Sequence, residues 1–338
     1  MKKPRIGIIP GDPAGIGPEL IARLLATDSV AETADILLIG DAHVFEAGAK
    51  IAGLPFETTS VGAEQDWRIA ESTAFALDAM ETISPEQVSM ATVSQACGAS
   101  VLRTLDRALA LAQAGQIDAI VFGPFNKAAM HLAGLGHEDE LHYMAEKLGV
   151  TGYVSELNTL DGIWTSRVTS HIALRDVADT ITGPRVEDAV HLIDRTLRRS
   201  GLARPRIAVA ALNPHAGDGG NFGREEIETL TPVVEKLAGR QMALTGPWPS
   251  DTVFLKAMRG EIDAVVTMYH DQGQIALKLL GFDRGVTVQG GLPVPITTPA
   301  HGTAFDIAGT GSADVGAIRA ALEIACKMVT HWHTEGAA

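Results

Sequence analysis

Short apolar runs alternate along the chain with segments of helical periodicity. Each run ends at Gly, Pro or polar residues, and the clearest are 6–9, 36–39, 119–122, 163–168, 207–212 and 264–268. Nearly continuous hydrophobicity over so few residues is typical of strands covered on both faces. Between these runs, apolar positions repeat at helical spacing over 101–112 and 189–197, and a last helix is expected from about 314 to 330. The alternation predicts an α/β fold with a largely parallel sheet.

Two stretches of this pattern resemble each other, residues 115–121 and 260–266. Each has a Gly that would end a helix, followed by a buried strand, which fits either an internal duplication or the ordinary way that a helix leads into a strand. Polar residues follow both strands: Asn126 and Lys127 in the first case, His270 and Asp271 in the second. Ligands of open α/β sheets bind at the carboxyl ends of strands, so these residues are candidates for a site.

Length and composition limit the classes of protein. A chain of 338 residues is long for one core and predicts two domains with a cleft between them. The net charge is −14, and basic residues do not cluster, so neither a nucleic acid nor an anionic membrane surface is an expected partner. Two cysteines, Cys97 and Cys326, do not make a disulfide framework, and no signal peptide or apolar span is recognisable. We expect a cytoplasmic protein with a small-molecule partner.

Three histidines stand in loops that a core would not easily bury. His171, His215 and His270 each come after an apolar strand, among residues such as Asn, Pro, Gly, Ser and Asp. Any one of them is explained as a surface or hydrogen-bonded residue. Together they predict one divalent metal site with open coordination positions, and imidazole ligands suit Zn, Mn, Co or Ni better than Ca.

Charged residues near these histidines have two interpretations. Asp271 fits a further ligand or an acceptor that orients an imidazole. Lys278 fits an acid or base, a partner for a substrate carboxylate, or a solvated surface lysine. Lys127 carries the same alternatives.

Two glycine-rich segments are candidates for cofactor binding. Residues 10–19 would form the turn into a helix with Pro18 in its first turn, although Leu20 stands where a dinucleotide-binding Gly-x-Gly-x-x-Gly pattern needs its last small residue. Residues 301–311 form a second glycine-rich loop before the last helix. A plain structural turn explains either segment equally well.

Assembled in order, these motifs resemble the 4-hydroxythreonine-4-phosphate dehydrogenase family of vitamin B6 biosynthesis over essentially the whole chain. The resemblance rests on residues 11–19, Gly123-Pro124 with Lys127, His171 with 174–176, 213–217, 269–273, and 301–304 with Ala308-Gly309.

The resemblance implies an isocitrate/isopropylmalate dehydrogenase-like fold: two α/β domains with an active site in the cleft between them. It also implies a homodimer that shares the site across its interface, NAD or NADP, and one divalent metal ion per site (Zn, Mn, Co, Ni or Mg). We expect residues 1–130 with 290–338 to form one domain, and 131–289 to form the domain for metal, substrate and dimerisation. The implied metal ligands are His171, His215 and His270, with one of them contributed by the partner subunit. The implied catalytic residues are Lys278, Asp271 and Asp251, and the implied cofactor-binding residues are Gly11, Asp12, Gly15, His301, Gly302, Thr303 and Ala304.

The sequence departs from the family pattern where a substrate phosphate would bind. Thr287 and Ile296 occupy positions where the family carries Asn and Arg, and an aliphatic side chain cannot replace a guanidinium on a phosphate. The Gly-His-Thr-Glu stretch of the family aligns with Glu140 and Leu141, or with His137 after a small gap, and acidic residues at 138–140 would repel a phosphate. The predicted substrate-binding residues are Lys278, Thr287, Ile296, Glu140, Leu141, His137 and Lys127.

We therefore expect NAD(P)-linked, metal-dependent oxidation of an acidic hydroxy compound, followed by β-decarboxylation where the substrate carries a suitable carboxylate. The departures favour a substrate other than 4-phosphohydroxythreonine. The alternatives are a cis-diol carboxylate, as in terephthalate dihydrodiol dehydrogenase, and a four-carbon acid phosphate such as threonate or erythronate 4-phosphate. From other classes, a catalytically silent sensor and a metal-dependent hydrolase also remain open.

Overall fold

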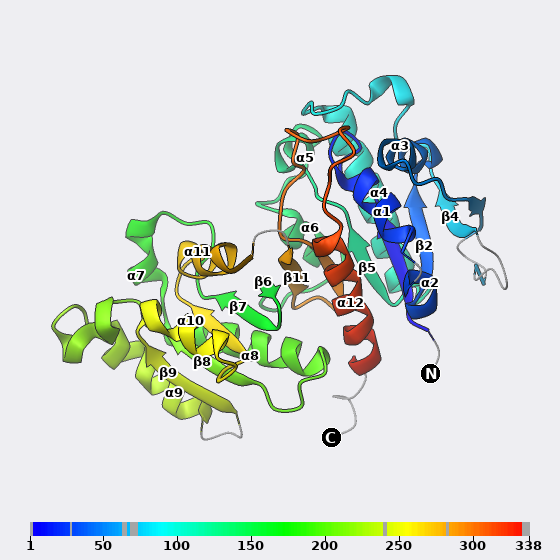
Figure 1. Cartoon of the computed structure of the whole chain (residues 1–338). Coiled ribbons are helices and arrows are strands. Elements are labelled where there is room, and N and C mark those ends of the chain that lie inside the picture. Colours follow the sequence, from blue (N-terminus) through cyan, green and yellow to red (C-terminus); the bar gives the residue numbers. More distant parts are fainter. Residues whose placement is uncertain are drawn as a thin grey trace. The chain divides into compact units, whose positions relative to one another are not determined.

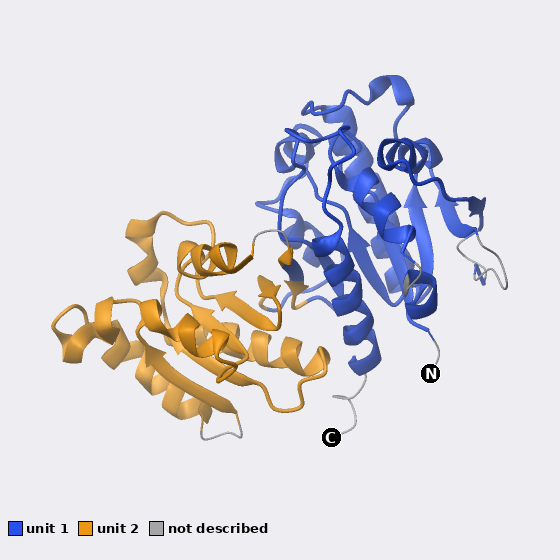
Figure 2. Ribbon diagram, in the orientation of Figure 1, with its two compact units in different colours: residues 1–152, 286–288, 292–333 blue, residues 153–285, 289–291, 334–338 orange. Residues whose placement is uncertain are grey.

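The computed structural model describes residues 3–27, 29–62, 66–67, 74–238, 242–281 and 284–332. The chain forms two compact units (Figure 2). Unit 1 takes its described residues from 1–152, 286–288 and 292–333, and unit 2 from 153–285 and 289–291. The functional roles expected for the two domains remain predictions.

Unit 1 is built on a mostly parallel sheet (Figure 1). Its strand order is β3-β4-β2-β1-β5-β12-β11, and β11 alone runs antiparallel to its neighbour β12. The predicted strands at 6–9, 36–39 and 119–122 are confirmed. The strands are β1 (Arg5–Ile9), β2 (Asp35–Gly40), β3 (Thr58–Ser60), β4 (Phe75–Ala79), β5 (Ala119–Phe122), β11 (Val286–Gly290, of which 286–288 belong to this unit) and β12 (Ile296–Pro299).

Helices connect the strands of unit 1, and α1 is buried at eight of its nine residues. The long helix over 101–112 and the last helix of the chain are confirmed, and Pro18 lies in the first turn of α1 as predicted. The helices are α1 (Gly17–Leu25), α2 (Ser29–Thr33), α3 (Ala42–Ala52), α4 (Gln95–Gln113), α5 (Lys127–Leu132), α6 (Glu140–Lys147) and α12 (Gly316–His331), with a 3₁₀ turn at Pro85–Gln87.

Unit 2 has its own strands in the order β6-β7-β10-β8-β9. Strand β6 is antiparallel to β7, and the others are parallel, so the carboxyl ends of β7, β10 and β8 share one edge. The strands are β6 (Ser155–Leu160), β7 (Ile163–Arg167), β8 (Arg206–Ala210), β9 (Ala243–Trp248) and β10 (Ala264–Thr267). The helices are α7 (Val177–Thr180), α8 (Gly183–Arg199), α9 (Thr231–Ala238), α10 (Ser250–Met258) and α11 (His270–Gly281), with short helical turns at Leu174–Asp176, Pro214–Gly220 and Glu226–Leu230.

One local expectation is wrong. His270 was expected in a loop, but it is the first residue of α11. Gly273 lies within this helix. It is buried against Thr267 of β10, where a larger side chain would be tightly packed, so the packing favours glycine there. Across the described part of the chain, no helix is long and apolar enough to cross a membrane.

Candidate metal and substrate site

His171 and His270 are neighbours in unit 2. The segment after β7 runs beside the segment after β10: the amide of Val168 donates to the Thr267 carbonyl at 2.9 Å, and the Thr169 hydroxyl donates to the Met268 carbonyl at 2.8 Å. This pairing continues past the strand ends and leaves the imidazole rings of the two histidines with their centroids 5.7 Å apart. The histidines that follow these two strands thus lie side by side, and their role as metal ligands remains a prediction.

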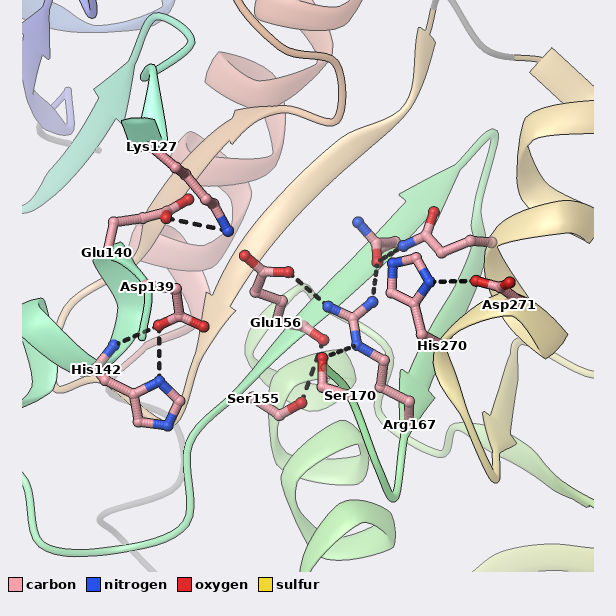
Figure 3. Close-up of polar contacts among 12 residues, drawn as sticks. Lys127, Asp139, Glu140, His142, Ser155, Glu156, Arg167, Ser170, His270 and Asp271 are labelled. Atoms are coloured by element: carbon pink, nitrogen blue, oxygen red, sulfur yellow. Dashed lines mark hydrogen bonds and ion pairs between the residues drawn. The ribbon is translucent and has the colours of Figure 1, made fainter. Parts of the chain in front are cut away.

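The His270 ring has one nitrogen engaged. Its Nδ1 lies 2.7 Å from Oδ1 of Asp271 (Figure 3). A carboxylate at Nδ1 favours the tautomer with the proton on that nitrogen, which leaves the Nε2 lone pair as the coordinating atom. Asp271 has the geometry of an orienting acceptor, one of the two roles that the sequence left open.

His215 lies in a loop with unusual backbone geometry. His215, Ala216 and Asp218 all have φ near +50°, between glycines that also have positive φ. Glu226 fixes the start of this loop, because its carboxylate accepts hydrogen bonds from the amides of Leu212 and Asn213 at 2.9 and 2.8 Å. Glu226 is 2% exposed, and nothing in the sequence distinguished it from other acidic residues.

The described residues of one chain bring together only part of the predicted metal site. In the part of the chain that the structure describes, no group of three or more His, Cys, Asp or Glu side chains lies close enough to hold a metal ion. Unit 2 supplies two imidazoles, and His215 is not grouped with them. An exposed imidazole beside a half-buried one that has a carboxylate on its other nitrogen fits a divalent metal whose remaining ligands come from elsewhere.

The two other predicted catalytic residues lie on helices of unit 2. Asp251 is exposed in the first turn of α10, and Lys278 is exposed in the last turn of α11. Lys278 follows Asp271 by seven residues, which places both on one face of α11, two turns apart.

In unit 1, the glycine-rich turn and the 301–304 loop lie in contact. The Ile16 amide donates to the Thr303 carbonyl at 3.1 Å, and a Cβ on Gly15 would lie 2.9 Å from the Thr303 Cβ. Gly11 has φ +81° and packs so tightly on Gly123 that a side chain would clash with its backbone. These glycines are therefore needed for close backbone packing, whatever else they do.

Asp12 is fully buried in this turn. Its Oδ1 accepts from the Ala14 amide at 2.8 Å, while its Oδ2 has no hydrogen-bond partner among the described residues. Burial raises the pKa of the Asp12 carboxyl, and the bond from Ala14 only partly opposes this.

The predicted substrate-side residues of unit 1 are largely engaged with one another. Lys127 begins α5 and lies 3.4 Å from Oε2 of the buried Glu140, which begins α6 (Figure 3). Asp139 caps α6 by accepting from the His142 amide at 2.9 Å and from its ring at 2.7 Å. Burial alone would raise the pKa of Asp139, but the bonds from His142 bring it below its usual value. Lys127 therefore offsets the charge of Glu140, whereas Asp139 stays ionised as the cap of α6.

Other substrate-side positions are less accessible than expected. Ile296 and Leu141 are 0% and 1% exposed, so they are core residues of unit 1 and not surface contacts. Thr287 is also buried, in β11. The His137 ring lies 2.9 Å from a carboxylate oxygen of Glu146.

The sequence matches the family described as pyridoxal phosphate biosynthetic protein PdxA over residues 32–325. The chain belongs to this family. A Pseudomonas aeruginosa relative, provisionally named 4-hydroxythreonine-4-phosphate dehydrogenase 2, is 54% identical over 97% of this chain and 98% of its own. D-threonate 4-phosphate dehydrogenase of Cupriavidus necator is 39% identical, with the same shares covered.

Solved structures agree with the PdxA assignment. The 4-hydroxythreonine-4-phosphate dehydrogenase of Klebsiella pneumoniae has a TM-score of 0.84 at 36% identity, covering 97% of this chain and 98% of its own. A terephthalate 1,2-cis-dihydrodiol dehydrogenase of Burkholderia xenovorans is more distant, with a TM-score of 0.65 at 29% identity over 96% and 98%.

Sequence reasoning missed one buried polar network in this PdxA-family chain. Arg167, the last residue of β7, is surrounded by Glu156, Asn158 and Ser170 (Figure 3). The available signal was an arginine inside a run, 163–168, that otherwise predicts a buried strand.

Proposed function

We propose that the protein is a divalent-metal-dependent, NAD(P)-linked dehydrogenase that oxidises a hydroxyl group of a small acidic compound. Membership of the PdxA family supports the reaction class. The observation that carries the metal site is the pair His171 and His270, with ring centroids 5.7 Å apart at the ends of two parallel strands. Strand ends of this kind are where α/β enzymes bind ligands.

Each residue of the proposed site has a defined task. When bound, the metal would lower the pKa of the substrate hydroxyl, and NAD(P) would accept the hydride. His171 and His270 would hold the metal, and Asp271 would keep the His270 tautomer that coordinates. Lys278, on the same face of α11 as Asp271, would bind a substrate carboxylate. In unit 1 the 10–19 turn and the 301–304 loop, which meet at Gly15 and Thr303, would bind the cofactor.

A phosphorylated four-carbon hydroxy acid is the substrate class that we propose first. It is supported by the names of relatives that match 97% of this chain at 39–54% identity. The pairing of Glu140 with Lys127 leaves less uncompensated negative charge than the sequence suggested. NAD and NADP are both compatible with the proposal.

An unphosphorylated cis-diol carboxylate is the second candidate. It is favoured by the resemblance alone, which places a phosphate-binding Asn and Arg at Thr287 and Ile296, both of which are buried in this structure. A catalytically silent sensor would bind such a compound without turnover, and a metal-dependent hydrolase would act without a nicotinamide cofactor.

A homodimer would complete the metal site. Exposed apolar side chains accompany each predicted ligand: Ile172 and Leu174 follow His171, Phe222 lies beside the His215 ring, and α11 carries Ile275 and Leu279 one turn apart. Leu279 is 83% exposed and Leu174 is 71% exposed. Large apolar side chains exposed around a site mark an interaction surface, and a two-fold dimer is the commonest assembly.

The test is substrate turnover joined to metal analysis. NAD(P)H production should be followed with 4-phosphohydroxythreonine, D-threonate 4-phosphate and a cis-dihydrodiol carboxylate, each with Zn²⁺, Mn²⁺, Co²⁺, Ni²⁺ or Mg²⁺. We expect His215→Ala to lose bound metal and turnover while circular dichroism shows an intact fold, and His191→Ala, on α8, to retain all three. Wild-type turnover by His215→Ala would refute the site. A protein that binds no divalent ion and turns over no substrate would favour the sensor, and turnover without NAD(P) would favour the hydrolase.

A further inference from the structure

Arg167 is a buried charge at the carboxyl end of β7. Its side chain is 5% exposed, and its main charge partner is Glu156 of β6, with Nη2 2.5 Å from a carboxylate oxygen. Buried ion pairs contribute little to stability compared with apolar residues of the same size. The ion pair between β6 and β7 therefore does not by itself explain an arginine at this position.

The arginine reaches the His171 segment. Its Nε donates to Oγ of Ser170 at 3.0 Å, and Ser170 directly precedes His171. Because the guanidinium is planar and rigid, this bond fixes where the chain leaves β7. The position of His171 thus depends on the plane of the Arg167 side chain.

The same guanidinium reaches α11 through one intermediate. Its Nη1 donates to Oδ1 of Asn158 at 3.1 Å, and that oxygen also accepts from Nε2 of Gln274 at 2.6 Å. Gln274 lies one turn after His270 on α11. Asn158 is 5% exposed, so water competes poorly for these bonds.

We propose that Arg167 is the positioning residue of the metal site, setting the separation of His171 and His270. One planar group holds the segment before His171 through Ser170 and the helix after His270 through Asn158 and Gln274. Arg167 does not touch the metal, and it acts by keeping two imidazoles at the spacing that one cation needs. This inference deepens the proposed function and depends on its metal site.

If Arg167 only joined two strands, removing another arginine–carboxylate pair of unit 2 would weaken metal binding equally. In unit 2, Arg206 also pairs with a carboxylate, through two nitrogens on Asp263 at 3.0 and 2.6 Å, but at the amino ends of β8 and β10, away from the histidines. Arg206→Gln is therefore a matched control. It removes an arginine–carboxylate fork between strands of the same unit without disturbing the segments that carry His171 and His270.

The experiment is a Co²⁺ titration of the full-length protein, with the visible absorption of the bound ion as the readout. We expect Arg167→Gln in a Glu156→Gln background, Ser170→Ala and Gln274→Ala each to weaken Co²⁺ binding about 10- to 100-fold, the usual effect of removing a residue that orients a ligand. Arg167→Lys should also bind weakly, because it keeps the charge opposite Glu156 but not the fork. Arg206→Gln should lower the thermal midpoint and leave Co²⁺ affinity unchanged.

Each result of the Co²⁺ titration either supports or overturns the positioning role of Arg167. Wild-type Co²⁺ affinity in Ser170→Ala, Gln274→Ala or Arg167→Lys would overturn the positioning role, and so would an equal loss of affinity in Arg206→Gln. The two single substitutions at Ser170 and Gln274 keep the test valid if the Arg167→Gln protein does not fold. Failure of the proposed function is distinguishable, because then the wild-type protein would not bind Co²⁺, or His171→Ala would bind it as well as the wild type.

Discussion

Asp12 combines full burial with an oxygen that has no hydrogen-bond partner among the described residues. Burial favours the neutral acid, so the pKa of this carboxyl is raised in the folded protein. The unfolded chain therefore ionises first as the pH rises above about 3.8. Folding stability that is present in acid is lost as the pH rises through the folded-state pKa.

We predict that Asp12→Asn gains stability relative to the wild type as the pH rises from 3 to 7. The amide keeps an acceptor for the Ala14 N–H and has no charge to bury. Urea unfolding at several pH values measures the difference. Asp12→Ala loses the acceptor but should show the same trend with pH; a difference that does not vary with pH in either variant would contradict the raised pKa.

At the residue scale, the sequence predicted the types of site residue better than their contacts. Turn-forming neighbours located His171 and His215 outside the core, whereas the contact of Gly15 with Thr303 joins segments too far apart in the sequence to be predicted. The Arg167 contacts were not predictable, because they join β6, β7 and α11, which lie more than 100 residues apart at the extremes. A side chain's partner depends on strand order and helix placement, which residue type and local pattern do not specify.

At the element scale, two pairs of neighbouring strands are joined at their amino ends by the same arginine–aspartate contact. Arg5 at the start of β1 donates from its amide and side chain to Asp118, just before β5. Arg206 at the start of β8 donates in the same way to Asp263, just before β10. The similarity between 115–121 and 260–266 thus reflects a shared structural unit. Buried strands were predictable from their apolar runs, while the first turn of α11 was not, since it is polar and contains glycine.

The second of these pairs gives a pH-dependent prediction. Hydrogen bonds from Arg206 lower the pKa of Asp263 below its usual value, against the opposing effect of burial. The pair therefore stabilises the fold above the unfolded-state pKa, and this contribution is lost as the pH falls through the folded-state pKa. Asp263→Asn should cost about 1–2 kcal/mol at pH 7, because Arg206 is half exposed.

Chemical unfolding from pH 7 to pH 3 checks this prediction. The gap between Asp263→Asn and the wild type should close in acid. Glu228→Gln, which breaks the exposed pair with Arg224, should change stability at pH 7 by less than about 1 kcal/mol. A gap that widens toward pH 3 would be inconsistent with a lowered Asp263 pKa.

At the scale of the whole molecule, the rings of His171 and His270 are neighbours within one chain, and His215, the third predicted ligand, is not grouped with them. Local sequence patterns predict which residues follow the end of a strand, but not which subunit supplies each metal ligand. If two subunits share the site, then His215 must come from a different chain than the pair His171 and His270. The exposed apolar residues beside all three histidines support such an interface.

Subunit mixing tests this arrangement. His215→Ala and His270→Ala should each be inactive alone. After dissociation and reassembly in equal amounts, half of the dimers are mixed, and each mixed dimer has one complete site out of two, so about a quarter of wild-type turnover should return. His171→Ala mixed with His270→Ala should recover nothing, because each chain then brings a damaged pair to every site. Recovery in that second mixture, or none in the first despite mixed dimers detected by mass spectrometry, would show that the pair and His215 do not divide between subunits.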